Sequence, residues 1–185
     1  MRELQLRIEP MTAESFVPFG EVWDAPEQPA DRRAMTRTGY AHDGRTTVNV
    51  IWQPQAGLAF HVLERHFGVT QSFVQLSGAP AVVCAAPPTA TDDPGDVPEP
   101  ASVRCFRIDP ARGWSFRRGT WHSLNRFILS PPGATFLILN SDPNPTQMVD
   151  YEAGRAMVYQ DLGADREPET LELPALPQVS FAVAP

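Results

Sequence analysis

Short apolar runs bounded by turn residues are the main pattern along this chain. Most of them are rich in β-branched and aromatic side chains, which is typical of strands rather than helices. Many short strands with a turn about every eight to twelve residues favour a sandwich or jelly roll over a fold of alternating strands and helices. The predicted strands cover residues 47–52, 59–65, 71–76, 81–85, 103–108, 114–117 and 135–139, and a further strand begins at 21–23.

Helical signals are few. Thr12 is a good N-cap residue with an acid in the turn after it, so the pattern predicts a short helix at 12–16 that ends before Pro18 and Gly20. A second short helix is expected at residues 151–162, after the last predicted strand. The sequence therefore predicts a mainly β chain with a few short helices.

Three segments lack a regular apolar pattern. Residues 25–46 are polar and rich in proline and arginine, and we expect them to cross the surface or the mouth of the fold. Residues 87–101 hold five prolines and four acids, which predicts a mobile loop. The proline-punctuated tail at 167–185 is expected to pack over the surface or a partner subunit.

Length and composition fit one domain. A chain of 185 residues can bury about two thirds of its unfolded surface. Its 20 prolines exceed the usual share of about 5%, which disfavours long helices. We predict a single domain over 1–185, in which an N-terminal segment at 1–46 flanks a barrel at about 47–141 and an extension follows at 142–185.

Charge and cysteine content limit the partners and the compartment. A net charge of −7 argues against a nucleic-acid partner, because phosphates are bound by clustered lysines and arginines. Cys84 and Cys105 lie in apolar runs without a C-x-x-C spacing, so we expect buried, reduced thiols. The N-terminus lacks the apolar core of a signal peptide, and no run of eighteen apolar residues could span a membrane. A cytoplasmic protein is expected.

Two polar blocks carry the candidate chemistry. The first, from Glu64 to Gln71, reads E-x-H-x₄-Q, and the second, from Arg117 to His122, reads R-x-G-x-x-H. They resemble the two blocks that cupin-type jelly-roll barrels bring to one barrel mouth. Glu64 stands for the first histidine of the cupin pattern and Arg117 for its proline. The resemblance implies a cupin-like jelly-roll β-barrel.

Strand periodicity predicts which of these side chains lie together. Glu64 and His66 share one face of their strand while Arg65 points the other way, and Arg118 shares a face with His122. If both faces look into the barrel, the carboxylate and the two imidazoles suit a divalent ion such as Ni²⁺, Zn²⁺, Mn²⁺ or Fe²⁺. Each histidine could instead be a hydrogen-bonded structural residue.

Other residues have two interpretations each. Glu64 could form an ion pair at the rim, and Gln71 could be a hydrogen-bonding group at the mouth. Arg118 could clamp a carboxylate or lie on the surface. Trp52 and Trp121 could belong to the core or to a pocket wall.

Several kinds of chemistry lack their motifs. The chain has no G-x-S-x-G elbow, no cysteine nucleophile signature, no glycine-rich phosphate loop and no dinucleotide fingerprint. Acid/base or metal-assisted chemistry on a small polar molecule remains, as does simple binding of such a molecule.

The chain also resembles the ureidoglycolate lyases of allantoin breakdown, from about Ile8 to Asp150. Its strongest match is Leu63–His66, with Gln71 and Phe73 following. The other matching blocks are 8–22, 76–83, 103–106, 118–122 and 136–139.

This resemblance implies a homodimer that cleaves ureidoglycolate to glyoxylate and urea, with help from Ni²⁺. From the two blocks we predict His66, His122 and Arg118 as catalytic residues, with His122 or His66 as the proton carrier and Arg118 or a metal holding the acid group. We expect the substrate to be bound by Arg65, Arg118, Trp52, Trp121 and Gln71, and a metal to be ligated by Glu64, His66, Gln71 and His122.

Two replacements keep alternatives open. Trp52 stands where the family usually has an arginine, and Ser123 stands where it has a second imidazole. A family member with another small carboxylate substrate, a non-catalytic cupin that binds a small ligand, and a metal-dependent dioxygenase are the alternatives.

Overall fold

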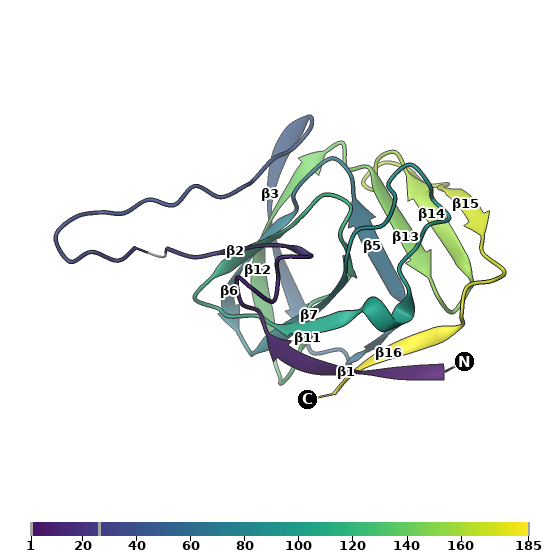
Figure 1. The fold of residues 1–185 in the computed structure, drawn as a ribbon, viewed down its shortest axis with the longest axis horizontal. Helices are drawn as coiled ribbons and strands as arrows, with labels where there is room; N and C mark the ends of the chain where they lie inside the picture. The colour runs from purple at the N-terminus through teal and green to yellow at the C-terminus, as the bar shows by residue number, and fades with distance from the viewer. Residues whose placement is uncertain (1, 26, 185) are drawn as a thin grey trace.

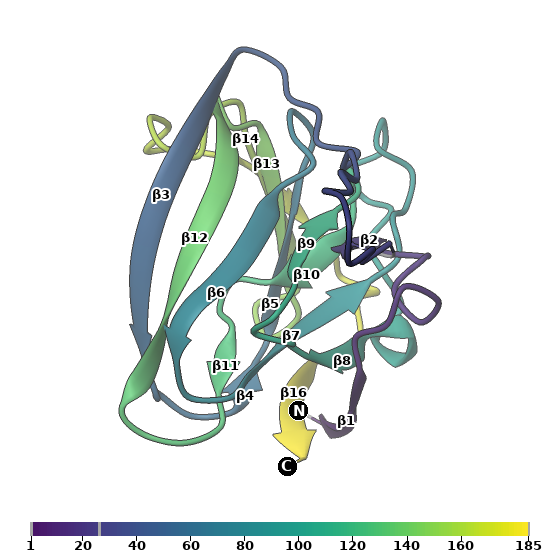
Figure 2. The ribbon, with the colours of Figure 1, turned by 90° about the vertical axis from the view of Figure 1, so that its left-hand side faces the viewer.

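The computed structural model describes residues 2–25 and 27–184, which form two curled β-sheets (Figures 1 and 2). The smaller sheet has the strand order β2, β9, β6, β12, β3. Its strands are β2 (Gly20–Trp23), β9 (Gly113–Phe116), β6 (Ser72–Gly78), β12 (Gly133–Asp142) and β3 (Arg45–Pro54). The edge strand β3 pairs with β12 along ten residues.

The larger sheet runs in the order β15, β14, β13, β5, β10, β7, β8, β1, β16, β4, with β11 also paired to β7. Its first five strands are β15 (Glu169–Glu172), β14 (Arg155–Tyr159), β13 (Thr146–Asp150), β5 (Val62–His66) and β10 (Trp121–Ser123). The others are β7 (Ala81–Ala86), β8 (Arg104–Arg107), β1 (Arg2–Pro10), β16 (Val179–Ala184), β4 (Ala59–Phe60) and β11 (Phe127–Ile128). The two sheets curl into a half-barrel, which confirms the predicted cupin-like β fold.

Apolar side chains fill both faces of the larger sheet at its centre. One core, between the two sheets, includes Phe73, Phe116 and Phe136. A second core on the opposite face includes Leu63 and Trp121. Strands β5, β7 and β10 are therefore buried on both sides, so their sequences do not alternate between apolar and polar residues.

Both ends of the chain contribute strands to the sheets. Strand β1 pairs in parallel with β16, so the first and last strands of the chain lie side by side (Figure 1). Strand β2 pairs with β9, and β13 pairs with β5. Residues 169–172 and 179–184 of the tail thus form strands that pair within the same chain.

Neither predicted helix is present. Residues 13–19 form successive turns, because Phe16 and Phe19 must both enter the core and Pro18 lacks an N–H to continue a helix. Residues 151–162 form a turn followed by β14. The Asp150 carboxylate accepts hydrogen bonds from two N–H groups of that turn, and Gly154 at φ 68° ends it. A 3-10 turn, η1 (Pro100–Ser102), follows the acidic loop.

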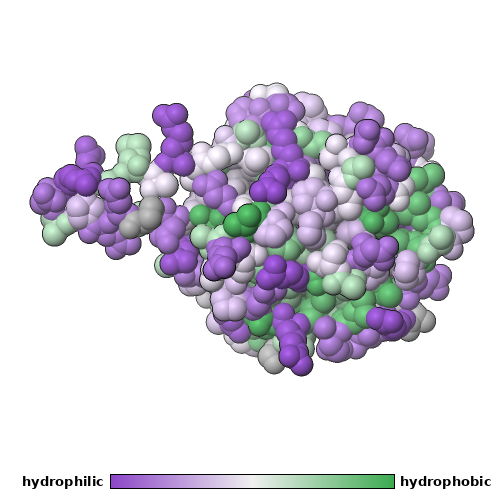
Figure 3. Space-filling view, in the orientation of Figure 1, coloured by the Kyte–Doolittle hydropathy of each residue, from purple (hydrophilic) through white to green (hydrophobic). Residues whose placement is uncertain are grey.

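Two long loops behave differently. Residues 24–25 and 27–38 extend from the body as a hydrophilic arm, and the chain returns to the body at His42, which bridges to Val69 (Figures 1 and 3). Residues 87–101 instead fold against the barrel, where Tyr151 donates to the carbonyl of Pro98 and Arg65 contacts the loop backbone. In the described part of the chain no helix has the length and apolar character needed to cross a membrane.

Candidate active site

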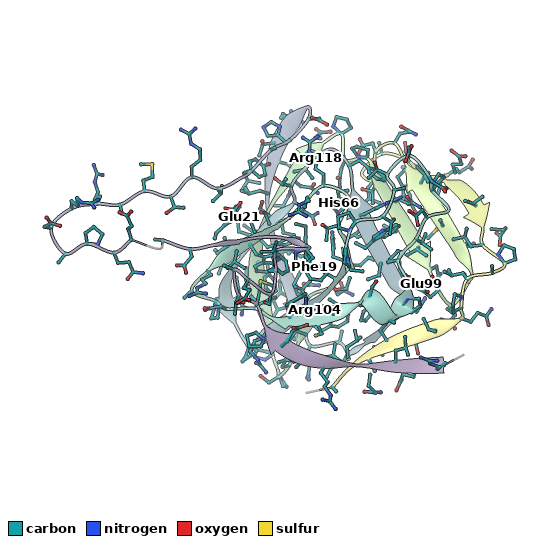
Figure 4. All side chains as sticks on the ribbon, viewed as in Figure 1. Phe19, Glu21, His66, Glu99, Arg104 and Arg118 are labelled. Atoms are coloured by element: carbon teal, nitrogen blue, oxygen red, sulfur yellow. The ribbon has the colours of Figure 1, made fainter. Side chains whose placement is uncertain are left out.

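Three polar side chains meet inside the barrel on strands β5 and β10. Glu64 and His122 are direct partners across these strands, and His66 lies two residues further along β5 on the same face. The imidazole centroids of His66 and His122 are 5.2 Å apart. Each of the three residues offers one ligand atom, and these atoms lie within 4.8 Å of one another. In Figure 4, His66 lies inside the barrel.

The hydrogen bonds of His66 fix its tautomer. Its Nδ1 lies 2.8 Å from Oγ1 of Thr146, the residue opposite it on β13. The Thr146 hydroxyl donates its own proton to the carbonyl of Asn144 at 2.9 Å. Nδ1 of His66 must therefore donate to Thr146, which leaves a lone pair on Nε2.

His122 has the same tautomer for a different reason. Its Nδ1 lies 3.2 Å from the carbonyl oxygen of Ser123, which can only accept a hydrogen bond. The ring stacks on Phe116 with centroids 4.4 Å apart and planes inclined by 7°. This contact holds the imidazole while its Nε2 keeps a free lone pair.

Burial sets the protonation states of the cluster. Desolvation lowers the pKa of His66 to about 4, against the opposing effect of the neighbouring Asn144 and Gln71 side chains. Desolvation, followed by the charge of His66, lowers the pKa of His122 well below its ordinary value. Burial raises the pKa of Glu64 to about 7, while the charge of Arg126 acts in the opposite direction. Two neutral imidazoles thus face a carboxyl group that titrates near neutrality.

The cluster has the chemistry of a divalent-metal site. Neither Nε2 has a hydrogen-bond partner among the residues that the structure describes, although both atoms are buried. Oε1 of Gln71 is also buried without a partner. Buried acceptors without a donor are costly unless a proton or a cation satisfies them. Glu64, His66 and His122 can therefore hold a metal ion.

Comparison with known proteins places the chain in a family. A profile of the ureidoglycolate lyase family matches residues 3–153. The chain belongs to the ureidoglycolate lyase family. A ureidoglycolate lyase of Rhodobacter capsulatus is 34% identical over 143 residues, which cover 70% of this chain and 81% of the relative. One of Stutzerimonas stutzeri is 33% identical over 129 residues, which cover 63% of this chain and 72% of the relative.

Two of the predicted substrate-binding residues lie on the opposite face of the sheet from the Glu64–His66–His122 cluster. Arg65 is fully buried, and its guanidinium donates to Gln147 and to the hydroxyl of Thr89. The same group lies 4.4 Å from the ring centroid of Trp121, whose indole N–H donates to Thr89. Because side chains alternate along β5 and β10, Arg65 and Trp121 support the strands from behind and do not face the Glu64–His66–His122 cluster.

Two more predicted residues lie away from the cluster. Arg118 is near the rim (Figure 4), where both of its terminal nitrogens contact the carboxylate of Asp43 at 2.9 and 3.0 Å. Trp52 is 53% exposed on the outer face of β3, opposite the buried Gln53. No hydrogen bond joins either side chain to the cluster among the described residues. Gln71, in contrast, lies beside His66.

Three residues of the site were missed from sequence. Asn144 precedes strand β13 and Thr146 begins it, and this strand was not predicted. Arg126 follows the second block in an ordinary polar stretch, yet it is 6% exposed and buried between the sheets. Its position before the apolar pair Phe127 and Ile128 is the one signal that could have indicated burial.

Proposed function

We propose that this protein is a carbon–nitrogen lyase that cleaves ureidoglycolate to glyoxylate and urea. The observation that carries the proposal is the pair of buried imidazoles, each with an unpartnered Nε2, beside the carboxyl group of Glu64. Membership of the ureidoglycolate lyase family, and the names of the relatives described above, support the choice of substrate.

The substrate chemistry suits these groups. Ureidoglycolate carries a hydroxyl and a urea nitrogen on the same carbon. A base removes the hydroxyl proton, the electron pair on oxygen forms the carbonyl of glyoxylate, and the C–N bond breaks as its electrons pass to nitrogen. The departing urea nitrogen then takes up a proton. Each imidazole is neutral at neutral pH, so a His66 or His122 ring whose Nε2 is not bound to a metal can accept the first proton and return it to the leaving group.

The same residues are proposed to hold a divalent metal, Ni²⁺ by family resemblance, with Zn²⁺ or Mn²⁺ as substitutes. Glu64, His66 and His122 would be its ligands, and Gln71 would complete the set with its amide oxygen. A bound divalent ion would stabilise developing negative charge on oxygen. Thr146 would hold the His66 ring in the tautomer that presents Nε2.

We also propose that the chain acts as a cytoplasmic homodimer. Val48, Val50 and Trp52 point outward from the edge strand β3, with exposed fractions of 63%, 65% and 53%, and Leu76 of β6 lies on the same sheet. An exposed apolar face next to an unpaired strand edge is a typical site of self-association. Cys84 and Cys105 are partners on adjacent strands, yet both thiols are free, which fits a reducing compartment.

Glyoxylate release from racemic ureidoglycolate by purified protein tests the enzymatic proposal. The reaction is followed with added Ni²⁺, with Mn²⁺ and with EDTA, and a sample without enzyme corrects for spontaneous decay. We expect release that depends on enzyme and that falls in EDTA. Enzyme-dependent release that EDTA leaves unchanged would reject the metal. No release in any sample would reject ureidoglycolate as substrate.

A further inference from the structure

A buried arginine lies between the two sheets without a full set of partners. Arg126 is 6% exposed, and its guanidinium lies 5.0 Å from the ring centroid of Phe73 and 5.5 Å from that of Phe136. Both rings belong to the core between the sheets, so the cation lies inside the barrel. Desolvation lowers its pKa to about 10, and the charge of Glu64 acts in the opposite direction. Arg126 therefore remains charged at neutral pH.

One side of this guanidinium is held firmly. Its Nε donates to Oε1 of Gln53 at 2.7 Å. Gln53 uses its own amide nitrogen to donate to Oδ1 of Asn125 at 2.9 Å, so its oxygen must face Arg126. The neutral glutamine thus orients the arginine without neutralising it.

The two terminal nitrogens of the guanidinium have no hydrogen-bond acceptor among the described residues. No hydrogen bond or ion pair to Nη1 or Nη2 of Arg126 occurs within residues 2–25 and 27–184. Leaving a buried charge unpaired is costly, so such a group is retained where something else pairs with it. The planar fork formed by these two nitrogens matches the two oxygens of a carboxylate.

Glu64 is the carboxyl group whose charge acts on Arg126, yet the two residues do not form an ion pair. Aromatic rings link Arg126 to the cluster: the Phe73 ring beside its guanidinium lies 5.8 Å from the ring of Phe116, on which His122 stacks. No nitrogen–oxygen contact of 4.0 Å or less joins Arg126 to Glu64 among the described residues, however. Glu64 therefore leaves Nη1 and Nη2 of Arg126 available to a small anion.

We propose that Arg126 is the substrate-binding residue that recognises the carboxylate of a small 2-hydroxy acid, and that it orients the hydroxyl-bearing carbon toward His66 and His122. This inference rests on the proposed function, since it concerns the same site. The other candidates are already engaged: Arg118 pairs with Asp43, and Arg65 lies on the opposite face of β5 with Gln147.

Binding of two matched probes tests this role. Glycolate carries the carboxylate and hydroxyl of the class, while glycolamide has the same shape without the charge. Titrations followed by calorimetry or NMR compare the wild-type protein with Arg126→Gln and Arg126→Lys. Arg107→Gln is the control, because Arg107 is an exposed arginine on β8. Circular dichroism and thermal unfolding check that every variant is folded.

We expect Arg126→Gln to weaken glycolate binding at least about tenfold, as the loss of a charge-assisted bidentate contact predicts. Arg126→Lys keeps the charge beside Glu64 but lacks the fork, so its affinity for glycolate should fall between the two. Glycolamide should bind all variants alike. With ureidoglycolate, Arg126→Gln should raise KM more than it lowers kcat, and added guanidinium should partly restore the rate.

Unchanged glycolate affinity in Arg126→Gln would overturn the proposal, as would an equal loss of affinity for both probes, which would indicate a structural role. Failure of the wild-type protein to bind glycolate would overturn it too. If neither variant folds, the Nε–H resonance of Arg126 in the wild-type protein decides: it should shift with glycolate and not with glycolamide. Wild-type glycolate binding through Arg126 without turnover of ureidoglycolate would reject the proposed function and leave this residue's role standing.

Discussion

Nδ1 of His66 donates to Oγ1 of Thr146 at 2.8 Å, and the proton of that hydroxyl is directed to the Asn144 carbonyl. This chain of two hydrogen bonds determines which imidazole nitrogen faces Glu64. Thr146, which lies outside the proposed set of metal ligands, therefore sets the tautomer of His66, one of the proposed ligands.

Thr146→Val keeps the shape of the side chain but removes the acceptor for His66. We expect Ni²⁺ affinity to fall about tenfold to a hundredfold, as is usual for lost partners of a metal-binding histidine. Equilibrium dialysis with elemental analysis measures the affinity. Thr170→Val, at an exposed position on β15, is the control. Equal affinities in the two variants would show that Thr146 does not orient His66.

His122→Ala removes one of the two proposed proton carriers. We expect kcat to fall at least about a hundredfold with the fold intact, which is the usual contribution of a positioned acid or base. His42→Ala is the matched control, because His42 is exposed in a loop outside the cluster. A His122→Ala rate within about threefold of wild type would remove this residue from the mechanism.

Glu64 should make the stability of the metal-free protein depend on pH. Its pKa is raised from 4.5 to about 7, so the folded state binds the extra proton, and this stabilisation disappears as pH rises through 7. The difference corresponds to roughly 3 kcal/mol. His66 acts at the other end of the range: its pKa is lowered to about 4, so stability is lost as pH falls below 6.5.

Glu64→Gln isolates the first effect. Relative to wild type, this variant should be more stable at pH 8 than at pH 5: the difference between its free energy of unfolding and that of wild type should be up to roughly 3 kcal/mol larger at pH 8. Urea denaturation in EDTA measures it, and the exposed Glu167→Gln serves as control. A difference between Glu64→Gln and wild type that is the same at both pH values would contradict a buried, titrating Glu64.

Arg65 should hold the acidic loop against the back of β5. Its guanidinium donates to Gln147, to the Thr89 hydroxyl and to the Ala90 carbonyl. Arg65→Met leaves these acceptors unpaired, so we expect unfolding to become easier by about 2–4 kcal/mol. Hydrogen exchange at residues 89–96 should also accelerate. The exposed Arg155→Met is the control, and equal stability of the two variants would refute the anchor.

Trp52 should stabilise the dimer and take no part in the chemistry. Trp52→Asp places a charge in the exposed apolar face of β3, so we expect the mass measured by analytical ultracentrifugation to fall from dimer to monomer. Leu171→Asp, at a position 38% exposed on the other sheet, should leave the mass unchanged. A monomeric wild-type protein, or a dimeric Trp52→Asp variant, would reject this interface.

Much of the barrel was predictable because its inner strands are rich in β-branched and aromatic residues. The predicted run at 81–85 became β7, and the run at 135–139 lies within β12. Strands β13 and β14 were not predicted, because the turn between them contains residues that also favour a helix. Pairing of β13 with β5, which is some eighty residues away, and of β14 with β13 decides their conformation.

The sequence by itself determined that Glu64 and His66 share a face, since side chains alternate along any strand. It also determined that a second histidine follows in a similar block. Only the tertiary structure decided that His122 stands opposite Glu64, because register depends on how distant strands pair.

The positions of three arginines also could not be derived from the sequence. Where both faces of a strand are buried, alternation tells which residues share a face but not which face holds the site. Arg65, Arg118 and Arg126 are chemically identical, so the sequence could not rank them. Packing placed the first behind the sheet, paired the second with Asp43, and left the third inside the barrel with two free nitrogens.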